Sequence, residues 1–433
     1  MRAAVIGLGS RAETWARGLS ERGTLAAFCD TSAHRMAVHN RWLAVAGQRQ
    51  VPGYGPEGFT RMLAEQAIDT VVVCTPDAHH TRYVLAALAV DLDVVVEKPL
   101  ATTLADLAAV VRAQAASRGT VRVAFNYRYN PAHSAVRELL TSGAVGEIGS
   151  VHFEWCLDTH HGADYFRRWH RRRTASGGLL VHKSSHHFDL VGWWLQADPA
   201  RVTAEGRLFA YGPSGAQAGH GAFAFDLHNS PRLADLYAGT DDGYRRDHDV
   251  FAPGVDIEDD MAVLVRWSSG ATMTYHLHAY SPWEGYRLAV NGSHGRLELE
   301  VEESAWARPG AGQAAVRLSG APDRGRMRWR IVVRPLWQAP YEVPVPPVSG
   351  AHGGGDERML ADLLDGVASG APADPLGRAA GLRDGVRAAV TGLAADESLT
   401  TGQAVDAAGR LREVLNVPSA TSTAPARPPV KEG

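Results

Sequence analysis

The chain has 433 residues, of which 45% are hydrophobic and 21% are charged, as is typical of a globular protein with room for two domains. Its formal net charge of −3 argues against binding to nucleic acids or membrane surfaces through bulk electrostatics. The three cysteines are too few and too widely spaced for a disulfide framework, and no apolar stretch approaches the ~18 residues of a membrane span. These features predict a cytoplasmic protein with neither nucleic-acid nor membrane partners.

Short apolar strands alternate with helices over the first part of the chain. The predicted strands cover residues 3–6, 24–29, 70–74, 93–96 and 121–125. The predicted helices end near residues 22 and 46 and then cover 80–89 and 104–117. This alternation is typical of a parallel sheet covered by helices on both faces. We therefore predict an α/β domain over residues 1–125.

A glycine-rich turn follows the first predicted strand. Gly7, Gly9 and Ala12 form a Gly-x-Gly-x-x-Ala pattern between a strand and a helix, and Asp30 lies about 20 positions further on. The first glycine of such a turn permits a tight bend, and the second lets the backbone approach a pyrophosphate at the helix N-terminus. The small third residue allows close helix–strand packing. The pattern predicts a dinucleotide site, in which Ser10 and Arg11 take part.

Asp30 indicates which dinucleotide is bound. Its carboxylate would accept hydrogen bonds from the adenosine ribose and would repel a 2′-phosphate. Arg11 and Arg35 weaken this preference, because either guanidinium could pair with such a phosphate. The predicted cofactor is NAD, with NADP as the less favoured alternative.

The pattern changes beyond residue 126. Strands at short spacing are predicted over residues 151–156, 201–208, 261–267, 271–278, 286–291 and 296–301. Helices are predicted over residues 178–195, 357–368 and 375–395. We expect a second, α+β domain over 126–415, built on a large and mostly antiparallel sheet. Residues 416–433 are rich in Ala, Pro, Ser and Thr and are predicted to form a disordered tail.

Lysine is rare in this chain, since only three of the 44 basic residues are lysines. Lys431 lies in the predicted tail, whereas Lys98 and Lys183 lie in segments crowded with other titratable groups. A compact ammonium can donate to a reacting oxygen and shift its pKa when buried, but a guanidinium stays charged and forked. Lys98 and Lys183 are therefore predicted to be catalytic.

The predicted helix over 178–195 carries a cluster of titratable side chains. At about 100° per residue, His182, His186 and Asp189 fall within a narrow arc, and Lys183 borders it. His186 is the predicted base for a hydroxyl proton, and Asp189 would orient it or bind a substrate hydroxyl. The same three residues also have metal-ligand spacing. Nicotinamide chemistry explains the cluster without an ion, so no metal is predicted.

Several motifs, taken in order, resemble the Gfo/Idh/MocA family, named for glucose–fructose oxidoreductase, inositol dehydrogenase and rhizopine catabolism. They are Cys74-Thr75-Pro76-Asp77-Ala78-His79-His80, Glu97-Lys98-Pro99, Asn126-Tyr127-Arg128-Tyr129-Asn130-Pro131 and the segment 177–189. The resemblance implies a Rossmann domain plus an open-faced sheet, with the site between them and Lys98 at the position of hydride transfer. It also implies further cofactor-binding residues, namely Thr75, Pro76, His80, Glu97 and Asn126.

The resemblance is imperfect at the second-domain helix. Many members of the family have an Asp four residues before the active-site histidine and a Gly two residues before it. Here those positions hold His182 and Ser184, and Lys183 is added. A carboxylate–histidine dyad is therefore not assumed, and proton relay through Lys183 or Lys98 is an alternative.

The segment before that helix mixes hydrogen-bonding groups with aromatic rings, as carbohydrate sites do. The predicted substrate residues are His160, His161, Tyr165, Arg168, Trp169, His182, His186 and Asp189. We expect an NAD(P)-dependent oxidoreductase that transfers hydride between nicotinamide and a secondary alcohol of a sugar, sugar derivative or cyclitol. One alternative recycles the cofactor within a turnover and gives elimination, glycoside cleavage or epimerisation. Another is a non-catalytic dinucleotide or sugar sensor. We also expect a homo-oligomer, a dimer or tetramer formed through the open face of the second sheet.

Overall fold

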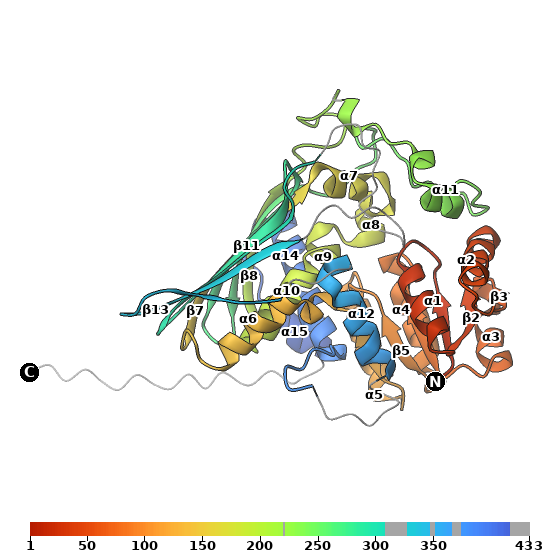
Figure 1. Ribbon diagram of the computed structural model, residues 1–433, viewed down its shortest axis with the longest axis horizontal. Helices are drawn as coiled ribbons and strands as arrows, with labels where there is room; N and C mark the ends of the chain where they lie inside the picture. The colour runs from red at the N-terminus through yellow and green to blue at the C-terminus, as the bar shows by residue number, and fades with distance from the viewer. Residues whose placement is uncertain (220, 308–326, 347–350, 366–373, 416–433) are drawn as a thin grey trace, which may run out of the picture.

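Two sheets, joined by helices packed between them, make up the protein (Figure 1). The computed structural model describes residues 1–219, 221–307, 327–346, 351–365 and 374–415. The predicted tail at 416–433, with Lys431, lies outside these residues. No helix in the described ranges is long and apolar enough to cross a membrane.

The first sheet is parallel and has the strand order β3-β2-β1-β4-β5-β6. Its strands are β1 (Ala3–Ile6), β2 (Leu25–Cys29), β3 (Gly53–Tyr54), β4 (Thr70–Val73), β5 (Asp93–Val96) and β6 (Val121–Val123). Its helices are α1 (Ala12–Glu21), α2 (Ala33–Val45), α3 (Phe59–Glu65), α4 (His80–Leu88) and α5 (Leu104–Ala115). The strand order reverses at β1, and ligands bind above such a point in open α/β sheets. The predicted parallel sheet is confirmed.

The second sheet has eight strands in the order β14-β13-β12-β11-β7-β10-β9-β8. They are β7 (Ile148–Asp158), β8 (Pro199–Arg207), β9 (Asp260–Trp267), β10 (Thr272–Ser281), β11 (Glu284–Gly292), β12 (Gly295–Ser304), β13 (Arg328–Pro335) and β14 (Tyr341–Val343). Among the described strands of this sheet, only β7 and β10 pair in parallel, so the predicted mostly antiparallel sheet is confirmed.

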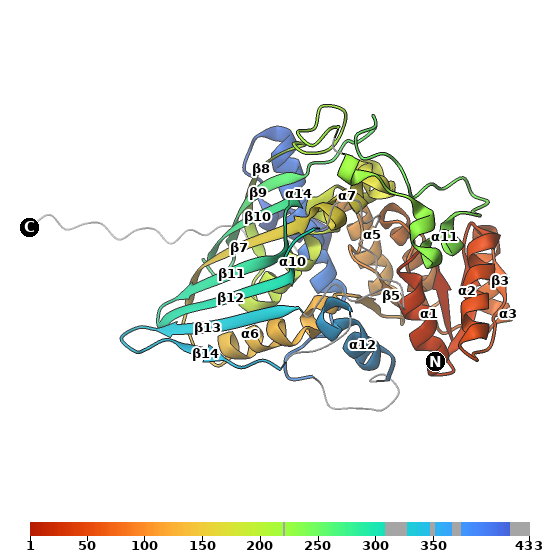
Figure 2. The same ribbon diagram turned by 45° about the horizontal axis from the view of Figure 1, so that its top comes forward.

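Helices cover one face of the second sheet and leave the other open (Figures 1 and 2). The covering helices are α6 (Pro131–Thr141), α9 (Leu179–His182), α10 (Ser185–Leu195), α14 (Leu382–Thr401) and α15 (Ala407–Leu415). Residues of β10 alternate accordingly, with Met273, Tyr275 and Leu277 buried and Thr274 and His276 exposed. Helices α14 and α15 also contact α5, so they tie the second domain to the first.

The helix predicted over residues 178–195 is broken into α9 and α10. The amides of Lys183 and Ser184 both donate to the Leu179 carbonyl, each at 2.9 Å, so the turn between the helices takes up an extra residue. This extra residue changes the helical phase. The side chains predicted to share one arc of a continuous helix therefore do not share a face.

A long connection between β8 and β9 leaves the second domain and reaches the first. We call residues 226–249 the α11 segment, because they contain α11 (Pro231–Tyr237). In both views this helix lies beside α2 of the first domain, and the two helices are in contact (Figures 1 and 2). Three other short helices, α7 (Thr159–Arg167), α8 (Arg173–Ser176) and α12 (Gly355–Leu360), lie near the boundary of the domains.

Candidate active site

The glycine-rich turn fits a bound dinucleotide. Gly7 has a left-handed φ of 84°, and a Cβ at this position would lie 2.6 Å from the backbone nitrogen of Thr75. The turn after β1 therefore packs against the end of β4 as only glycine allows. Thr75 Oγ1 and Asn126 Oδ1 are buried without a hydrogen-bond partner in the described structure. Buried polar atoms usually have partners, so these two oxygens fit the polar groups of a cofactor.

Asp30 ends β2 beside this turn. One of its carboxylate oxygens accepts from the Leu8 amide at 2.5 Å, and the other accepts from the Ser32 amide and the Arg35 guanidinium, each at 2.7 Å. The Arg35 guanidinium also donates to Asp242 of the α11 segment. Arg35 is thus already paired with two carboxylates and is not available to a phosphate.

Arg11 and Glu97, both predicted to bind the cofactor, bind each other. Arg11 Nε donates to Glu97 Oε1 at 2.5 Å, and the Trp15 indole donates to the same oxygen at 2.8 Å. The other end of the guanidinium donates to Asp356 of α12 at 2.8 Å, as does the Asn126 amide. These hydrogen bonds link the start of α1, the end of β5 and α12, and contact of Arg11 and Glu97 with a cofactor stays a prediction.

His80, which was also predicted to bind the cofactor, bridges two loops. Its ring is fully buried, and its two nitrogens lie 2.7 Å from the Pro99 carbonyl and 3.1 Å from the Thr75 carbonyl. Burial lowers the pKa of His80 to about 4, so the imidazole is neutral. His80 therefore positions the loops after β4 and β5, and its contact with a cofactor stays a prediction.

The two domains meet at a hydrogen-bonded chain that we call the Asp77–His182–Lys98 triad. Lys98 Nζ lies 3.1 Å from His182 Nε2 and donates to the His182 carbonyl, also at 3.1 Å. His182 Nδ1 lies 2.5 Å from Asp77 Oδ2. Lys98 and Asp77 follow β5 and β4 of the first domain, whereas His182 ends α9 of the second. The triad therefore exists only when both domains are in place.

Burial sets the protonation of the triad. It lowers the pKa of Lys98 to about 8, with Asp77 and Glu97 opposing the shift. It also lowers the pKa of His182 well below the ordinary value, an effect that the Lys98 charge strengthens. A neutral imidazole donates from one nitrogen and accepts at the other, and an ammonium can only donate. With Lys98 charged, His182 must accept at Nε2 and donate from Nδ1 to Asp77.

Aromatic rings surround His182. The His170 ring lies 4.3 Å from it, and the rings of Tyr165 and Trp169 lie at 5.5 and 5.7 Å, all in edge-on arrangements. His170 is fully neutral, because burial lowers its pKa well below the usual value. Two predicted substrate residues, Tyr165 and Trp169, are thus placed next to the triad.

The other predicted substrate residues lie near Tyr165. Its hydroxyl lies 3.3 Å from His161 Nε2, and His161 Nδ1 lies 2.6 Å from Glu284 Oε1 of β11. The Arg168 guanidinium lies over the Tyr165 ring at 5.6 Å. His160 is in the first turn of α7, where its amide donates to Asp158 at 2.9 Å. The segment 158–169 therefore presents polar groups and ring faces beside His182.

Lys183 and His186 lie in a separate buried cluster. Lys183 Nζ donates to the Tyr127 hydroxyl at 3.1 Å and lies 5.0 Å from the centre of the Trp155 ring. The His186 ring stacks on Tyr127 with centroids 4.3 Å apart. Burial lowers the pKa of Lys183. The partner of Lys98 is thus His182, and the role predicted for His186 as the base remains a prediction.

Asp189 is not part of this site. Its two oxygens accept from Arg128 Nε at 2.7 Å and Arg128 Nη2 at 2.5 Å, and both side chains are 1% exposed. With its carboxylate engaged by Arg128, Asp189 can neither orient His186 nor bind a substrate hydroxyl, contrary to prediction. The same pairing with Arg128 engages the third residue of the alternative metal-ligand set. The described residues contain no group of three or more His, Cys, Asp or Glu side chains suited to a metal ion.

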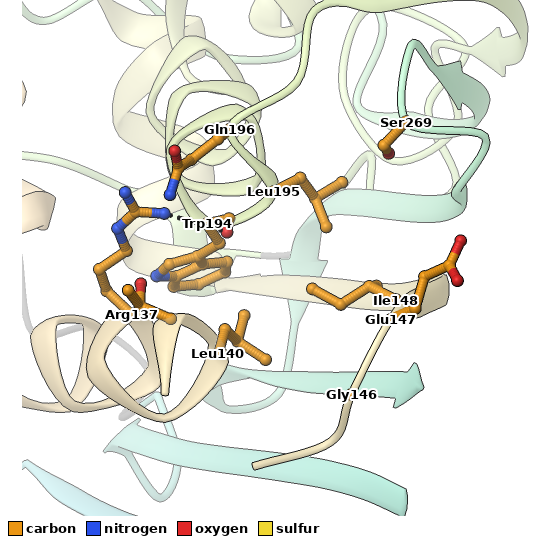
Figure 3. A pocket seen from close by; sticks show the side chains of 10 residues that line it. Arg137, Leu140, Gly146, Glu147, Ile148, Trp194, Leu195, Gln196 and Ser269 are labelled. Atoms are coloured by element: carbon orange, nitrogen blue, oxygen red, sulfur yellow. Dashed lines mark hydrogen bonds between the residues drawn. The ribbon is translucent and has the colours of Figure 1, made fainter. Parts of the chain in front are cut away.

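A pocket on the second domain, shown in Figure 3, is lined by none of these residues. It is formed by α6, the start of β7 and the end of α10. Its lining residues are Arg137, Leu140, Thr141, Gly146, Glu147, Ile148, Trp194, Leu195, Gln196 and Ser269. None of them was predicted to be functional. Arg137 donates to the backbone carbonyls of Trp193 and Trp194, at 2.6 and 3.2 Å, so its guanidinium caps the C-terminus of α10.

Comparison with known proteins matches both domains. Residues 1–125 match the model described as "Oxidoreductase family, NAD-binding Rossmann fold", and residues 137–406 match "Oxidoreductase family, C-terminal alpha/beta domain". The putative oxidoreductase YteT of Bacillus subtilis is 37% identical over 76% of this chain and 78% of its own. An inositol 2-dehydrogenase of Acidothermus cellulolyticus is 32% identical over 47% of this chain and 56% of its own.

The fold is also similar to solved structures. One is an oxidoreductase from Agrobacterium radiobacter, solved in complex with NAD+, L-tartaric acid and magnesium. It superimposes with a TM-score of 0.66 over 94% of this chain and 99% of its own, at 19% identity. At this level of identity, the similarity establishes the fold alone.

Proposed function

The chain belongs to the Gfo/Idh/MocA oxidoreductase family, and we propose that it is an NAD-dependent dehydrogenase of a secondary alcohol on a sugar, sugar derivative or cyclitol. The observation that carries this proposal is the Asp77–His182–Lys98 triad. It puts a half-buried lysine with a lowered pKa at the boundary between an NAD-binding domain and a second domain. Perturbed titratable groups of this kind are typical of active sites.

Lys98 is proposed to take the hydroxyl proton during oxidation. Two of its three N–H groups are directed to His182, and the third has no partner among the described residues, which leaves it for the substrate oxygen. As a neutral amine Lys98 accepts the proton, and as an ammonium it stabilises charge on the oxygen. Bound NAD supplies the acceptor for the hydride. His182 holds the Lys98 nitrogen in place and Asp77 fixes the tautomer of His182.

The substrate class is proposed from the surroundings of His182. Trp169 and Arg168 are half-buried beside His182, where an aromatic ring and guanidinium N–H groups can meet the C–H groups and hydroxyls of a sugar or cyclitol. Tyr165 and His161 belong to the same segment and pack against each other. An inositol 2-dehydrogenase among the relatives supports a polyhydroxylated ring. The test is to supply NAD and a panel of sugars, sugar acids and cyclitols and to follow absorbance of the reduced cofactor. The proposal fails if no polyol on the panel gives reduced cofactor.

The rate of oxidation should depend on pH through Lys98. Its lowered pKa of about 8 means that the ammonium dominates below pH 8 and cannot accept a proton. We expect kcat/KM for alcohol oxidation to rise as pH passes through about 8 and then to level off. The reverse reduction, which needs the ammonium as the acid, should fall over the same range. The midpoint should survive in His186→Ala. If it disappears there, His186 is the base.

Asp77→Asn should lower kcat/KM at pH 7 by about 10-fold or more, because an amide can donate to His182 Nδ1 and so favour the wrong tautomer. The Asp77 charge also raises the pKa of Lys98, so its loss should move the midpoint of the pH profile below 8. The exposed Asp93→Asn serves as the control and should change neither quantity. An unshifted midpoint in Asp77→Asn would show that Asp77 has only a packing role.

We also propose that copies of the chain associate through the open face of the second sheet in the cytoplasm. The helices leave this face uncovered (Figures 1 and 2), and Leu264 of β9 is 51% exposed on it. Among its neighbours are the exposed side chains of Thr274 and His276 on β10.

A further inference from the structure

We propose that two aspartates of the α11 segment, Asp241 and Asp242, make the dinucleotide site selective for NAD over NADP. They do so by occupying the hydrogen-bond donors that a 2′-phosphate would use. The selectivity would then come from the second domain as well as from Asp30 of the first. The proposal concerns binding alone, so it does not depend on the substrate or on the proposed dehydrogenase activity.

The turn from β2 into α2 is rich in donors. It carries the hydroxyls of Thr31 and Ser32, the Ala33 amide and the Arg35 guanidinium, and Ser32 caps the N-terminus of α2. Asp30 precedes this turn at the position where an acidic residue binds the adenosine ribose in Rossmann domains. Hydroxyls, an arginine and the first amides of a helix form a donor set suited to phosphate. The first domain alone would therefore offer hydrogen-bond donors to a 2′-phosphate, and only the charge of Asp30 would oppose it.

The α11 segment fills this donor set with carboxylates. Asp242 accepts from the Thr31 hydroxyl at 2.7 Å and from both terminal nitrogens of Arg35, with the Nη1 contact at 3.3 Å. Asp241 accepts from the Ser32 hydroxyl and, at 3.2 Å, from the amide of the next residue. The two side chains thus take the place that phosphate oxygens would need.

Charge strengthens the effect. The hydrogen bond from Ser32 holds the pKa of Asp241 below its usual range. Burial raises the pKa of Asp242, but hydrogen bonds from Arg35 and Thr31 outweigh it and lower the pKa overall. Both are therefore anions at neutral pH. The 2′-phosphate of NADP, with a charge of about −2, would be repelled by these two carboxylates and by Asp30. The adenosine ribose of NAD carries only hydroxyls at this position.

Other contacts fix the α11 segment in this position. The Tyr237 hydroxyl accepts from the Ser10 amide at 2.9 Å, at the glycine-rich turn itself. On the outer side of α2, Asp235 accepts from the Trp42 indole at 2.9 Å and from Arg41 at 2.5 Å. These last anchors leave the dinucleotide site clear, so they can persist when the cofactor is bound. Figures 1 and 2 show α11 lying against the first domain from both directions.

The experiment is to titrate the full-length protein with NAD and with NADP and to measure both dissociation constants by fluorescence quenching. In Asp241→Asn/Asp242→Asn the ratio of the NADP constant to the NAD constant should fall at least ~10-fold, mainly through tighter NADP binding. Asp247→Asn removes one charge from the same segment, where Asp247 contacts only its neighbour Arg245 among the described residues. This control should keep the native ratio.

A further substitution tests the cause. Adding Arg35→Leu to the double variant should remove the gain in NADP affinity, because Arg35 is the cation that the substitutions release. If the double variant does not fold, Asp242→Asn alone should lower the ratio at least ~3-fold. The proposal is overturned if the ratio stays native, or if the affinities for both cofactors change by the same factor. Either result can be told apart from a failure of the proposed dehydrogenase activity, because these titrations need no substrate.

Discussion

Lys98→Ala is expected to lower turnover by at least ~100-fold, the usual scale for a positioned acid–base or electrostatic group. The remaining side chains cannot replace it, because His182 is a neutral imidazole already hydrogen-bonded to Asp77 and, through Nε2, to Lys98 itself. NAD affinity should change little, since Asp30 and the glycine-rich turn are untouched. The measurements are steady-state kinetics with the best substrate of the panel and a NAD titration of the same sample.

Lys98→Arg should fail nearly as badly as Lys98→Ala. A guanidinium stays charged at every accessible pH, so it cannot accept the hydroxyl proton, and its planar fork does not fit the place of an ammonium between His182 and a substrate oxygen. Lys431→Ala, in the C-terminal segment, is the control for loss of a lysine. If Lys98→Arg keeps more than half of the native rate, Lys98 is not the proton acceptor. A protein that binds NAD and sugar without any turnover, in the native form as well, would be a sensor.

The first domain could be predicted well from sequence because its strands are buried on both faces. Apolar runs such as Thr70–Val73 are separated by helices at regular spacing, and each strand found is parallel to its neighbours. The two elements missed there, β3 and α3, are short and carry little periodicity. In the second domain, alternation along β9 and β10 indicated strands, but β13 and β14 have weaker patterns and were missed.

The active site was predicted only in part, because its partners come from distant segments. The rarity of lysine pointed to Lys98, and the resemblance pointed to the helix that carries His182. The extra residue in the turn at Ser184 could not be foreseen from a regular helical wheel, so the predicted arc with Asp189 was wrong. The Asp77 carboxylate lies 105 positions before His182 in the sequence. One signal for this pair was available in the sequence. Asp77 supplies a carboxylate in the strand-end motif, and His182 stands where the family often has Asp.

The contacts of the α11 segment with the first domain could not be predicted, for a similar reason. It is short, polar and joined to long connections, so its pattern resembles that of a surface loop. Its function depends on contacts such as Asp242 with Arg35, more than 200 positions apart, which no local pattern encodes. In this protein, the contacts that only the structure reveals are those between polar side chains of one domain and charged side chains of the other.

Asp189→Asn should lower the free energy of unfolding of the second domain by about 3–5 kcal/mol, because it leaves the buried Arg128 guanidinium without its bidentate partner. Asp384, at 3.0 Å from Arg128 Nη2, can compensate only in part, since it also pairs with Arg387. Arg128→Met should cost a similar amount. Urea unfolding, followed by the fluorescence of nearby Trp193, measures both variants.

The double variant Arg128→Met/Asp189→Leu separates a structural pair from a catalytic one. It removes both charges at once, so its loss of stability should be well below the sum of the two single losses. If Asp189 serves packing, the folded fraction of Asp189→Asn should keep the native kcat and the midpoint near pH 8 that Lys98 sets. Native stability combined with lost turnover in Asp189→Asn would contradict this, and would return Asp189 to the catalytic role that the sequence predicted.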